Sequence, residues 1–329
     1  MLLIITNEAD IHPNPVIDHL IEKGLPFFRF NTDKILTDYD VIYEISNEKT
    51  FFEIKYKQHN LSINNTQITC VWERRPMEPL ATYDPFDDEN VKKIILDEAD
   101  GFIKFFRYSL TNVLWIGHPI IERQAGSKIL QKIVAKEIGF RIPDTIFSNV
   151  FSTIEIFENK QVAIKPISSF DIEASGGNIV FYTRKKSYQD LKNIGEISFR
   201  NNVNFIEEYI EKDYELRVTV IKDTCFSAKI ESQKLDLEKG AIDWRQGYDH
   251  GISFTEISIP EEIEAKCFLF LEYFNLNFGC FDFIVEKNGN HVFLECNTNG
   301  QWMWLEEEAK LPISKKLAEI FENEIKKKC

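Results

Sequence analysis

Short apolar runs alternate with amphipathic segments along the first third of the chain. Residues 2–6 and 27–31 are apolar runs that predict strands. Residues 14–23, which lie between them, predict a helix that stops at Gly24. A strand, a helix and a strand at this spacing predict a βα unit of an open parallel sheet. Further predicted elements of this region are strands at 41–45, 50–56, 61–63, 69–72 and 113–116 and a long amphipathic helix at 89–110.

A second region begins near Ile120. Residues 128–138 carry apolar side chains at helical spacing, and this helix stops at Gly139. The polar stretch 185–202 predicts a helix and a hairpin. With 329 residues, the chain has room for two or three domains. The other predicted elements are strands at 162–166, 179–183, 204–210, 214–221 and 225–231 and helices at 261–274 and 313–328.

A hairpin near the end of the chain brings two carboxylates together. Asn288-Gly289 lies between two β-rich runs and predicts a two-residue turn. Such a turn sets Asp282 opposite Glu295, and Asn297 lies on the same face. Carboxylate and amide oxygens suit Mg²⁺, which leaves its other positions to water and phosphates. The alternative is an exposed hairpin face with solvated acids.

Cationic residues at three places are candidates for contact with an anion. Arg74 and Arg75 end a strand, and strand ends of α/β sheets face the ligand crevice. Lys128 lies in the first turn of its helix, where a cation opposes the helix dipole and indicates an anionic partner. In both cases the alternative is a solvated side chain. Lys165 precedes the small-residue loop 168–178, an arrangement suited to binding phosphate.

Two further segments place charged residues where a ligand or substrate can meet them. Glu215 and Arg217 alternate with apolar neighbours on one strand, so they share a face. Asp243, Trp244 and Arg245 lie in a long polar stretch, which predicts a substrate loop.

Composition narrows the class of protein. The net charge of -14 argues against a general nucleic-acid surface, which needs a basic stripe. Six scattered cysteines without a C-x-x-C pair favour reduced thiols, so we expect a cytoplasmic protein. No apolar run approaches the roughly 18 residues that a membrane span needs, and the first residues lack the pattern of a signal peptide.

The order of these features resembles the ATP-grasp superfamily. The motifs VWERRP, AIKP, ELRVTV, DWR and FLECNTNGQW are similar, more closely, to those of the graspetide (microviridin-type) peptide macrocyclases. Thr298 stands where that family has a proline, a change we expect to be tolerated because only the Asn297 side chain is needed. The resemblance implies a pre-ATP-grasp α/β domain at 1–119, followed by two α+β subdomains, a central one at 120–203 and a C-terminal one at 204–329.

The resemblance also implies ATP and Mg²⁺ as cofactors and assigns roles to the candidate residues. Mg²⁺ would lie on Asp282, Glu295 and Asn297, Arg217 would face the transferred phosphoryl group, and loop 168–178 would close over the phosphates. Lys128 and Lys165 would contact the phosphates, with the adenine edge as the alternative for Lys165. The backbone of Glu207, Glu208, Tyr209 and Ile210 would contact adenine, and Glu215 would contact the ribose. Arg245 would receive the substrate's acidic side chain, and the peptide would contact Arg74, Arg75, Asp243, Trp244 and Trp302.

The implied partner is a ribosomally made precursor peptide with a leader, which contacts residues 181–202, and an acidic core. A Glu or Asp side chain of the core would be activated as an acyl phosphate and joined to a Thr or Ser hydroxyl, forming a macrolactone. Amide formation with Lys is the second reading, and addition of a free amino acid to a peptide or protein is the third. A nucleotide-binding regulatory protein without turnover is the alternative from another class. The family further implies a homodimer.

Overall fold

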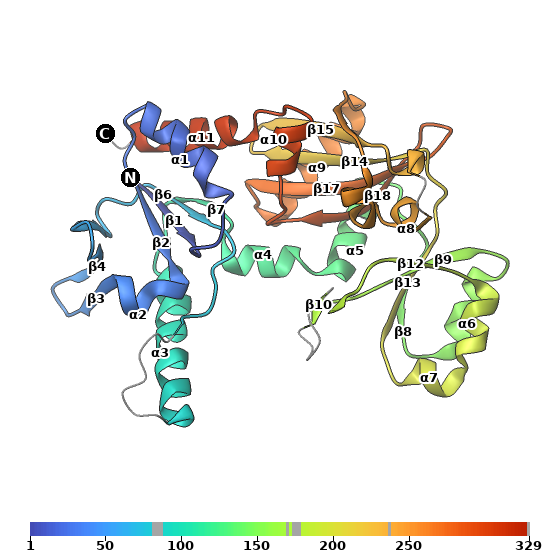
Figure 1. Ribbon diagram of the computed structural model, residues 1–329, viewed down its shortest axis with the longest axis horizontal. Helices are drawn as coiled ribbons and strands as arrows, with labels where there is room; N and C mark the ends of the chain where they lie inside the picture. The colour runs from blue at the N-terminus through green and yellow to red at the C-terminus, as the bar shows by residue number, and fades with distance from the viewer. Residues whose placement is uncertain (81–87, 169–170, 173–178, 236–237, 328–329) are drawn as a thin grey trace.

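The computed structural model describes residues 1–80, 88–168, 171–172, 179–235 and 238–327 of the chain. Figure 1 shows an N-terminal domain on the left, a small lobe at the lower right and a C-terminal lobe at the upper right, with helix α4 (Pro119–Ala125) running between them. No helix among these residues combines the length and apolar character needed to cross a bilayer.

The N-terminal domain is built on a parallel sheet with the strand order β2-β1-β6-β7. Its central strand, β1 (Leu2–Thr6), is buried along its whole length, as expected for a parallel strand covered on both faces. This confirms the predicted βα unit. The other elements are α1 (Pro13–Glu22), β2 (Phe27–Asn31), η1 (Thr32–Lys34), α2 (Ile35–Asp38), the antiparallel meander β3 (Tyr39–Ile45), β4 (Thr50–Tyr56) and β5 (Leu61–Asn64), then β6 (Cys70–Glu73), α3 (Glu89–Tyr108) and β7 (Leu114–Ile116).

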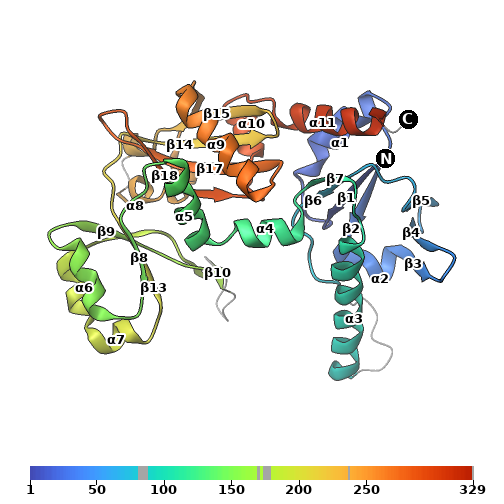
Figure 2. The same cartoon turned by 180° about the vertical axis from the view of Figure 1, so that it is seen from behind.

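The last helix of the chain belongs to the packing of this domain. Helix α11 (Ile313–Lys327) lies beside α1, and Figures 1 and 2 show the two together over the parallel sheet. Trp72 of β6 packs against Phe321 of α11, with 5.6 Å between ring centroids. The opposite face of the sheet packs on α3 and the meander. The C-terminal subdomain predicted at 204–329 therefore includes a helix, α11, that packs in the core of the N-terminal domain.

The small lobe contains an antiparallel sheet with the order β12-β9-β13-β8. Because β13 lies in the middle of this sheet, the boundary predicted between residues 203 and 204 is wrong, and the C-terminal sheet begins only at Tyr214. The elements from α5 to β13 are α5 (Lys128–Ile138), β8 (Thr145–Ser148), η2 (Phe151–Phe157), β9 (Gln161–Lys165), β10 (Asp171–Ile172), β11 (Ile179–Val180), β12 (Arg184–Ser187), α6 (Tyr188–Ile194), α7 (Glu196–Arg200) and β13 (Asn204–Glu208).

The C-terminal lobe is an antiparallel sheet with the order β16-β15-β14-β17-β18. Its apolar face packs against α9 together with α4 and α5, so α5 belongs to this lobe rather than to the central one predicted for it. Helix α5 ends at Gly139, which has the left-handed φ of 92° typical of a helix C-cap. The elements are β14 (Tyr214–Ile221), β15 (Thr224–Ile230), η3 (Ser232–Lys234), α8 (Glu238–Ile242), η4 (Trp244–His250), β16 (Phe254–Glu256), α9 (Glu261–Phe274), β17 (Phe278–Val285), β18 (His291–Asn297), α10 (Met303–Glu308) and α11.

Candidate active site

The hairpin of β17 and β18 sets Asp282 opposite Glu295, as predicted. The neighbouring pair on the turn side is Phe283 with Phe293. Leu294 therefore has no partner in β17 and forms a bulge in β18. A bulge shifts the alternation of side chains by one position. Phe293 belongs to the apolar core, whereas Glu295 lies on the opposite face, with Asp282.

Asn297 joins this face at the end of β18. It pairs with Cys280, two positions beyond the pair of carboxylates, and its side chain is exposed. The amide oxygen of Asn297 accepts a 3.1 Å hydrogen bond from the backbone N–H of Asn299. This bond begins a turn that orients the asparagine amide.

Three cations surround the two carboxylates. Arg217 of β14 donates to Asp282 at 2.8 Å. Arg245 Nη2 lies 3.5 Å from Asp282 Oδ2 and 3.7 Å from Glu295 Oε1, and Lys128 Nζ lies 3.7 Å from Glu295 Oε2. Burial alone would raise the pKa of Glu295, but the cations near it outweigh burial, Lys128 first and Arg245 second, and lower the pKa to about 2. The carboxylate is therefore ionised at neutral pH.

The donor set fits Mg²⁺. No group of three His, Cys, Asp or Glu side chains is arranged as a metal site in the part of the chain that the structure describes. Two carboxylates and one amide oxygen are nevertheless a set that Mg²⁺ accepts, because it keeps water and phosphate oxygens in its other positions. Asp282, Glu295 and Asn297 would hold the ion.

The lysine end of the site is organised by a buried carboxylate. Glu207 of β13 is 1% exposed and lies 2.5 Å from both Lys165 Nζ and Lys132 Nζ. Burial lowers the pKa of Lys132, whereas Glu207 and Glu295 outweigh burial and raise that of Lys165. The ring of Phe205 lies beneath Lys128 and Lys165, at 5.7 and 6.0 Å from their ammonium nitrogens.

The strand expected to contact adenine runs past this cluster. The N–H of Glu208 donates to the carbonyl of Asp144, and the N–H of Tyr209 donates to that of Gln161. Two of the expected donors are thus engaged within the lobe. Glu207 meets the site through its side chain, and the side chain of Ile210 packs in an apolar group with residues of β17 and β18.

Glu215 and the Asp243–Arg245 segment lie on the same side of the sheet. Glu215 is paired with Lys212 at 2.7 Å, and Lys212 also donates to the carbonyl of Ile242 at 2.9 Å. Asp243 caps η4 by accepting from the N–H of Arg245 at 3.2 Å. Trp244 is buried against Trp304 and Phe254 rather than open to a peptide. Of this triplet, Arg245 is the part that reaches the carboxylates.

Trp302 and Arg74, which are also predicted to contact the peptide, are buried at the boundary with the N-terminal domain. Trp302 has no exposed surface and packs edge-to-face on His12 at 5.5 Å, because the N-terminal domain covers it. Arg74 is 1% exposed and donates to Asn299 and Gly300 of the C-terminal lobe. Neither forms a wall of an open pocket. Arg75 is exposed, as a substrate contact requires.

Two residues of α5 that shape the site, Lys132 and Gln131, were not predicted from the sequence. Lys132 lies one turn after Lys128 and pairs with Glu207. The i, i+4 spacing of two lysines on one helix was a signal for it. Gln131 donates to the carbonyl of Cys296 at 2.7 Å and accepts from the N–H of Cys296 at 2.8 Å. These two bonds anchor β18 at the residue that lies between Glu295 and Asn297.

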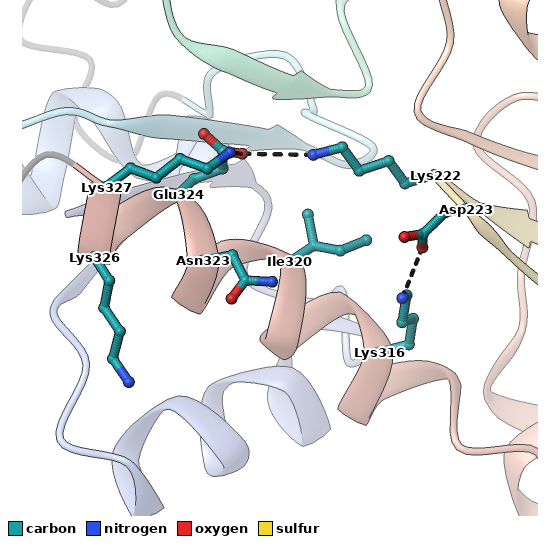
Figure 3. A pocket seen from close by; sticks show the side chains of 8 residues that line it. All are labelled: Lys222, Asp223, Lys316, Ile320, Asn323, Glu324, Lys326 and Lys327. Carbon is teal, nitrogen blue, oxygen red and sulfur yellow. Dashed lines mark hydrogen bonds and ion pairs between the residues drawn. The ribbon is translucent and has the colours of Figure 1, made fainter.

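A hollow of about 410 Å³ lies between α11 and the turn that joins β14 to β15, and none of the candidate site residues lines it. Figure 3 shows two of its lysines directed at acidic partners, Lys222 at Glu324 and Lys316 at Asp223, and Lys326 pairs with Glu322, whose side chain the figure does not draw. Because these cations are already paired, the hollow is not suited to an anionic ligand.

The predicted phosphate loop at 168–178 falls largely outside the described residues, which include only Ser168, Asp171 and Ile172 of it. The predicted leader region contains β12, an edge strand of the small lobe, followed by α6 and α7. Arg184 and Lys186 of this strand are accessible, whereas Leu191 is buried in the lobe's core.

Comparisons with known proteins agree with this arrangement. Residues 1–123 match the model of the MvdD pre-ATP grasp domain. The crystal structure of macrocyclase MdnC, bound with precursor peptide MdnA from Microcystis aeruginosa MRC, has a TM-score of 0.82 and 29% identity and covers 98% of this chain and 99% of that chain. No curated protein sequence matches the chain.

Two further structures share the fold at lower identity. A RiPP-associated ATP-grasp ligase of Chryseobacterium gregarium, in complex with ADP and a leader and core peptide, has a TM-score of 0.87 and 24% identity over 97% of this chain and 95% of that chain. The ATP-grasp ligase PsnB, complexed with a phosphomimetic variant of a minimal precursor, Mg and ADP, has a TM-score of 0.75 and 17% identity over 98% of each chain. The chain is thus an ATP-grasp ligase with a pre-ATP-grasp domain of the MvdD type, and over nearly its full length it is similar to the macrocyclase MdnC.

Proposed function

We propose that this protein uses ATP and Mg²⁺ to close macrolactone rings in a ribosomally made precursor peptide. A Glu or Asp carboxylate of the peptide attacks the γ-phosphoryl group of ATP, which gives an acyl phosphate and ADP. A Thr or Ser hydroxyl of the same peptide then attacks the acyl carbon, phosphate leaves, and the hydroxyl proton is released. Each ring forms with the net loss of one water from the peptide.

The observation that carries this proposal is the pair Asp282 and Glu295 with cations around it. Mg²⁺ bound there would bridge phosphate oxygens and offset the charge of the transferred group. Arg217, Lys128 and Lys165 lie around the same face and would bind the phosphates, since phosphoryl transfer depends chiefly on positioning and charge compensation.

Arg245 is the residue best placed to receive an acidic side chain. Its side chain is 44% exposed, and in this structure its guanidinium faces Asp282 and Glu295. A metal ion on those carboxylates would compete for the same oxygens and leave the guanidinium to a substrate carboxylate, which it can grip with two parallel hydrogen bonds.

The leader of the precursor is proposed to contact the β12 to α7 region. β12 is an edge strand with a free side among the described residues, and it carries Arg184, Lys185 and Lys186. An edge strand with basic side chains suits an acidic peptide segment that adds to the sheet or packs beside it. A precursor peptide is the bound partner in the structures of MdnC and PsnB, and this chain is proposed to bind such a peptide and to form a homodimer.

Co-expression with a candidate precursor tests the proposal. We expect the peptide to lose the mass of one water per ring and ADP to accumulate. Mild base should then reopen the rings, because esters hydrolyse far faster than amides. Rings that resist base would establish the amide reading, and a gain in mass equal to an amino acid residue would establish the ligation of a free amino acid. An unchanged precursor mass, with ATP bound, would overturn the proposal.

A further inference from the structure

We infer that Arg74 is a positioning residue through which the N-terminal domain fixes the loop 297–301 at the metal end of the ATP site. This inference rests on the proposed function, since it concerns the binding of the divalent ion by that site. It assigns to the N-terminal domain a part in ion binding, in addition to its role in the fold.

Arg74 reaches across the domain boundary. It follows directly after the paired residues of β6, is 1% exposed, and donates from Nη1 to Asn299 Oδ1 at 3.1 Å and to the carbonyl of Gly300 at 3.2 Å. Its Nε lies 3.4 Å from Asp10 Oδ2 in the N-terminal domain. One guanidinium thus joins the carboxyl edge of the parallel sheet to a loop more than two hundred residues later in the chain.

The same loop is held from its other side by the sheet of the C-terminal lobe. Arg217, which pairs with Asp282, donates to the carbonyl of Gln301 at 3.2 Å. A Cβ at Gly300 would lie 2.6 Å from Cys280 Cβ and 2.8 Å from Arg217 Nη2, so the backbone at this point sits closely between them. The loop therefore has little freedom between the two arginines.

The link to the ion passes through Asn299. Its side-chain oxygen accepts from Arg74, and its backbone N–H donates to Asn297 Oδ1 at 3.1 Å. A residue that orients a ligand in this way acts on metal affinity without touching the metal. Loss of Arg74 should let Asn299 turn and release the asparagine amide from its orientation.

Burial of a guanidinium carries a cost that a packing role does not explain. Burial lowers the pKa of Arg74 to about 10, and Nη2 has no hydrogen-bond partner among the residues that the structure describes. An apolar side chain would join the two domains at lower cost. An apolar residue would lack the N–H groups with which Arg74 binds Asn299 and Gly300.

The test compares Arg74→Met, Arg74→Lys and Arg107→Met in the full-length protein. Arg107 is the matched control, because it is also a buried arginine of the N-terminal domain, paired with Glu73 and without a contact to the loop. Binding of Mn²⁺ in the presence of ADP is measured by isothermal titration, and unfolding in urea is measured in parallel. Hydrogen exchange of residues 297–301 reports on the loop itself.

Arg74→Met should weaken Mn²⁺ binding by roughly tenfold or more, the usual effect of removing an outer contact of a ligand. Arg74→Lys should recover part of the affinity, and Arg107→Met should lose stability without a change in Mn²⁺ affinity. Asn299→Ala combined with Arg74→Met should be little worse than either alone, because both act through one contact.

An Arg74→Met protein that binds Mn²⁺ as tightly as the wild type, or an Arg107→Met protein that loses affinity equally, would overturn the inference. A wild-type protein that fails to bind Mn²⁺ with ADP would overturn the proposed function instead. The two failures are therefore separable.

Discussion

Arg217 and Asp282 face each other on the neighbouring strands β14 and β17, and the guanidinium donates to the carboxylate at 2.8 Å. Both residues are buried, with exposures of 4% and 8%. The opposite charges of the two side chains compensate each other. A metal ion at Asp282 would share that carboxylate with Arg217, which places the arginine beside the ion and the phosphates.

Replacing Arg217 should therefore affect both stability and catalysis. Arg217→Met leaves the buried Asp282 with only its longer contact to Arg245, so we expect a loss of about 3 kcal/mol in the free energy of unfolding. Loss of the cation at the phosphoryl group should lower kcat by about 10²–10³-fold. Arg217→Lys retains the charge and should keep more of both. ADP release and urea unfolding measure the two effects, and a Met variant with unchanged kcat would exclude Arg217 from the reaction.

The metal-binding role of the hairpin is tested by isosteric changes. Glu295→Gln and Asp282→Asn keep the side-chain shape but remove a charge, so we expect ring formation to fall by at least about 10²-fold while the precursor still binds. Glu256→Gln, at an exposed position of β16, is the control. Mass spectrometry of the precursor is the readout. Full biological activity of the two site variants would favour a nucleotide-binding regulator without turnover.

The sequence predicted the pairing of Asp282 with Glu295, but through a wrong account of the hairpin. A two-residue turn would pair Val285 with Val292, whereas the structure pairs it with His291. The bulge at Leu294 then restores the expected alignment. Turn length and bulges depend on local backbone geometry, which the Asn-Gly signal does not determine beyond the tip.

Burial of Arg74 and Trp302 was not predictable from local pattern. Arg74 ends a strand and Trp302 follows a glycine-containing turn, and both resemble ligand contacts when seen alone. Each is buried by residues of the other domain, Asn299 and His12 respectively. The helix and strand periods were sufficient to predict most elements, because those periods reflect each element's own buried face.

The carboxylate of Glu207 should be essential to the lysine end of the site. Glu207→Gln leaves Lys132 and Lys165 close together and without their shared partner, so we expect a loss of about 3–5 kcal/mol in the free energy of unfolding. Adding Lys132→Met should recover part of this loss, because one unpaired buried charge is then removed. Urea unfolding of the single and double variants measures the coupling. Additive losses would show that the two residues act independently.

Glu122, which lies at the domain boundary, should make the stability of the protein depend on pH. Its Oε2 accepts a hydrogen bond from Asn299 at 3.3 Å, and Oε1 is buried without a hydrogen-bond partner among the described residues. Burial, with a smaller contribution from Glu73, raises the pKa of Glu122 from 4.5 to about 8, against the opposing effect of Asn299. The carboxyl group is therefore protonated in the folded protein at neutral pH.

Between pH 4.5 and about 8 the unfolded chain has lost the Glu122 proton while the folded chain retains it, so the stability of the protein falls as pH rises. Glu122→Gln keeps a neutral group of the same shape and escapes this loss. The variant should gain stability over the wild type progressively across that window, with a constant difference below and above it. Urea unfolding from about pH 4 to 9 measures the difference, with Glu256→Gln as a control that should track the wild type. Parallel curves for the wild type and the Glu122→Gln variant would show that this carboxyl ionises normally in the fold.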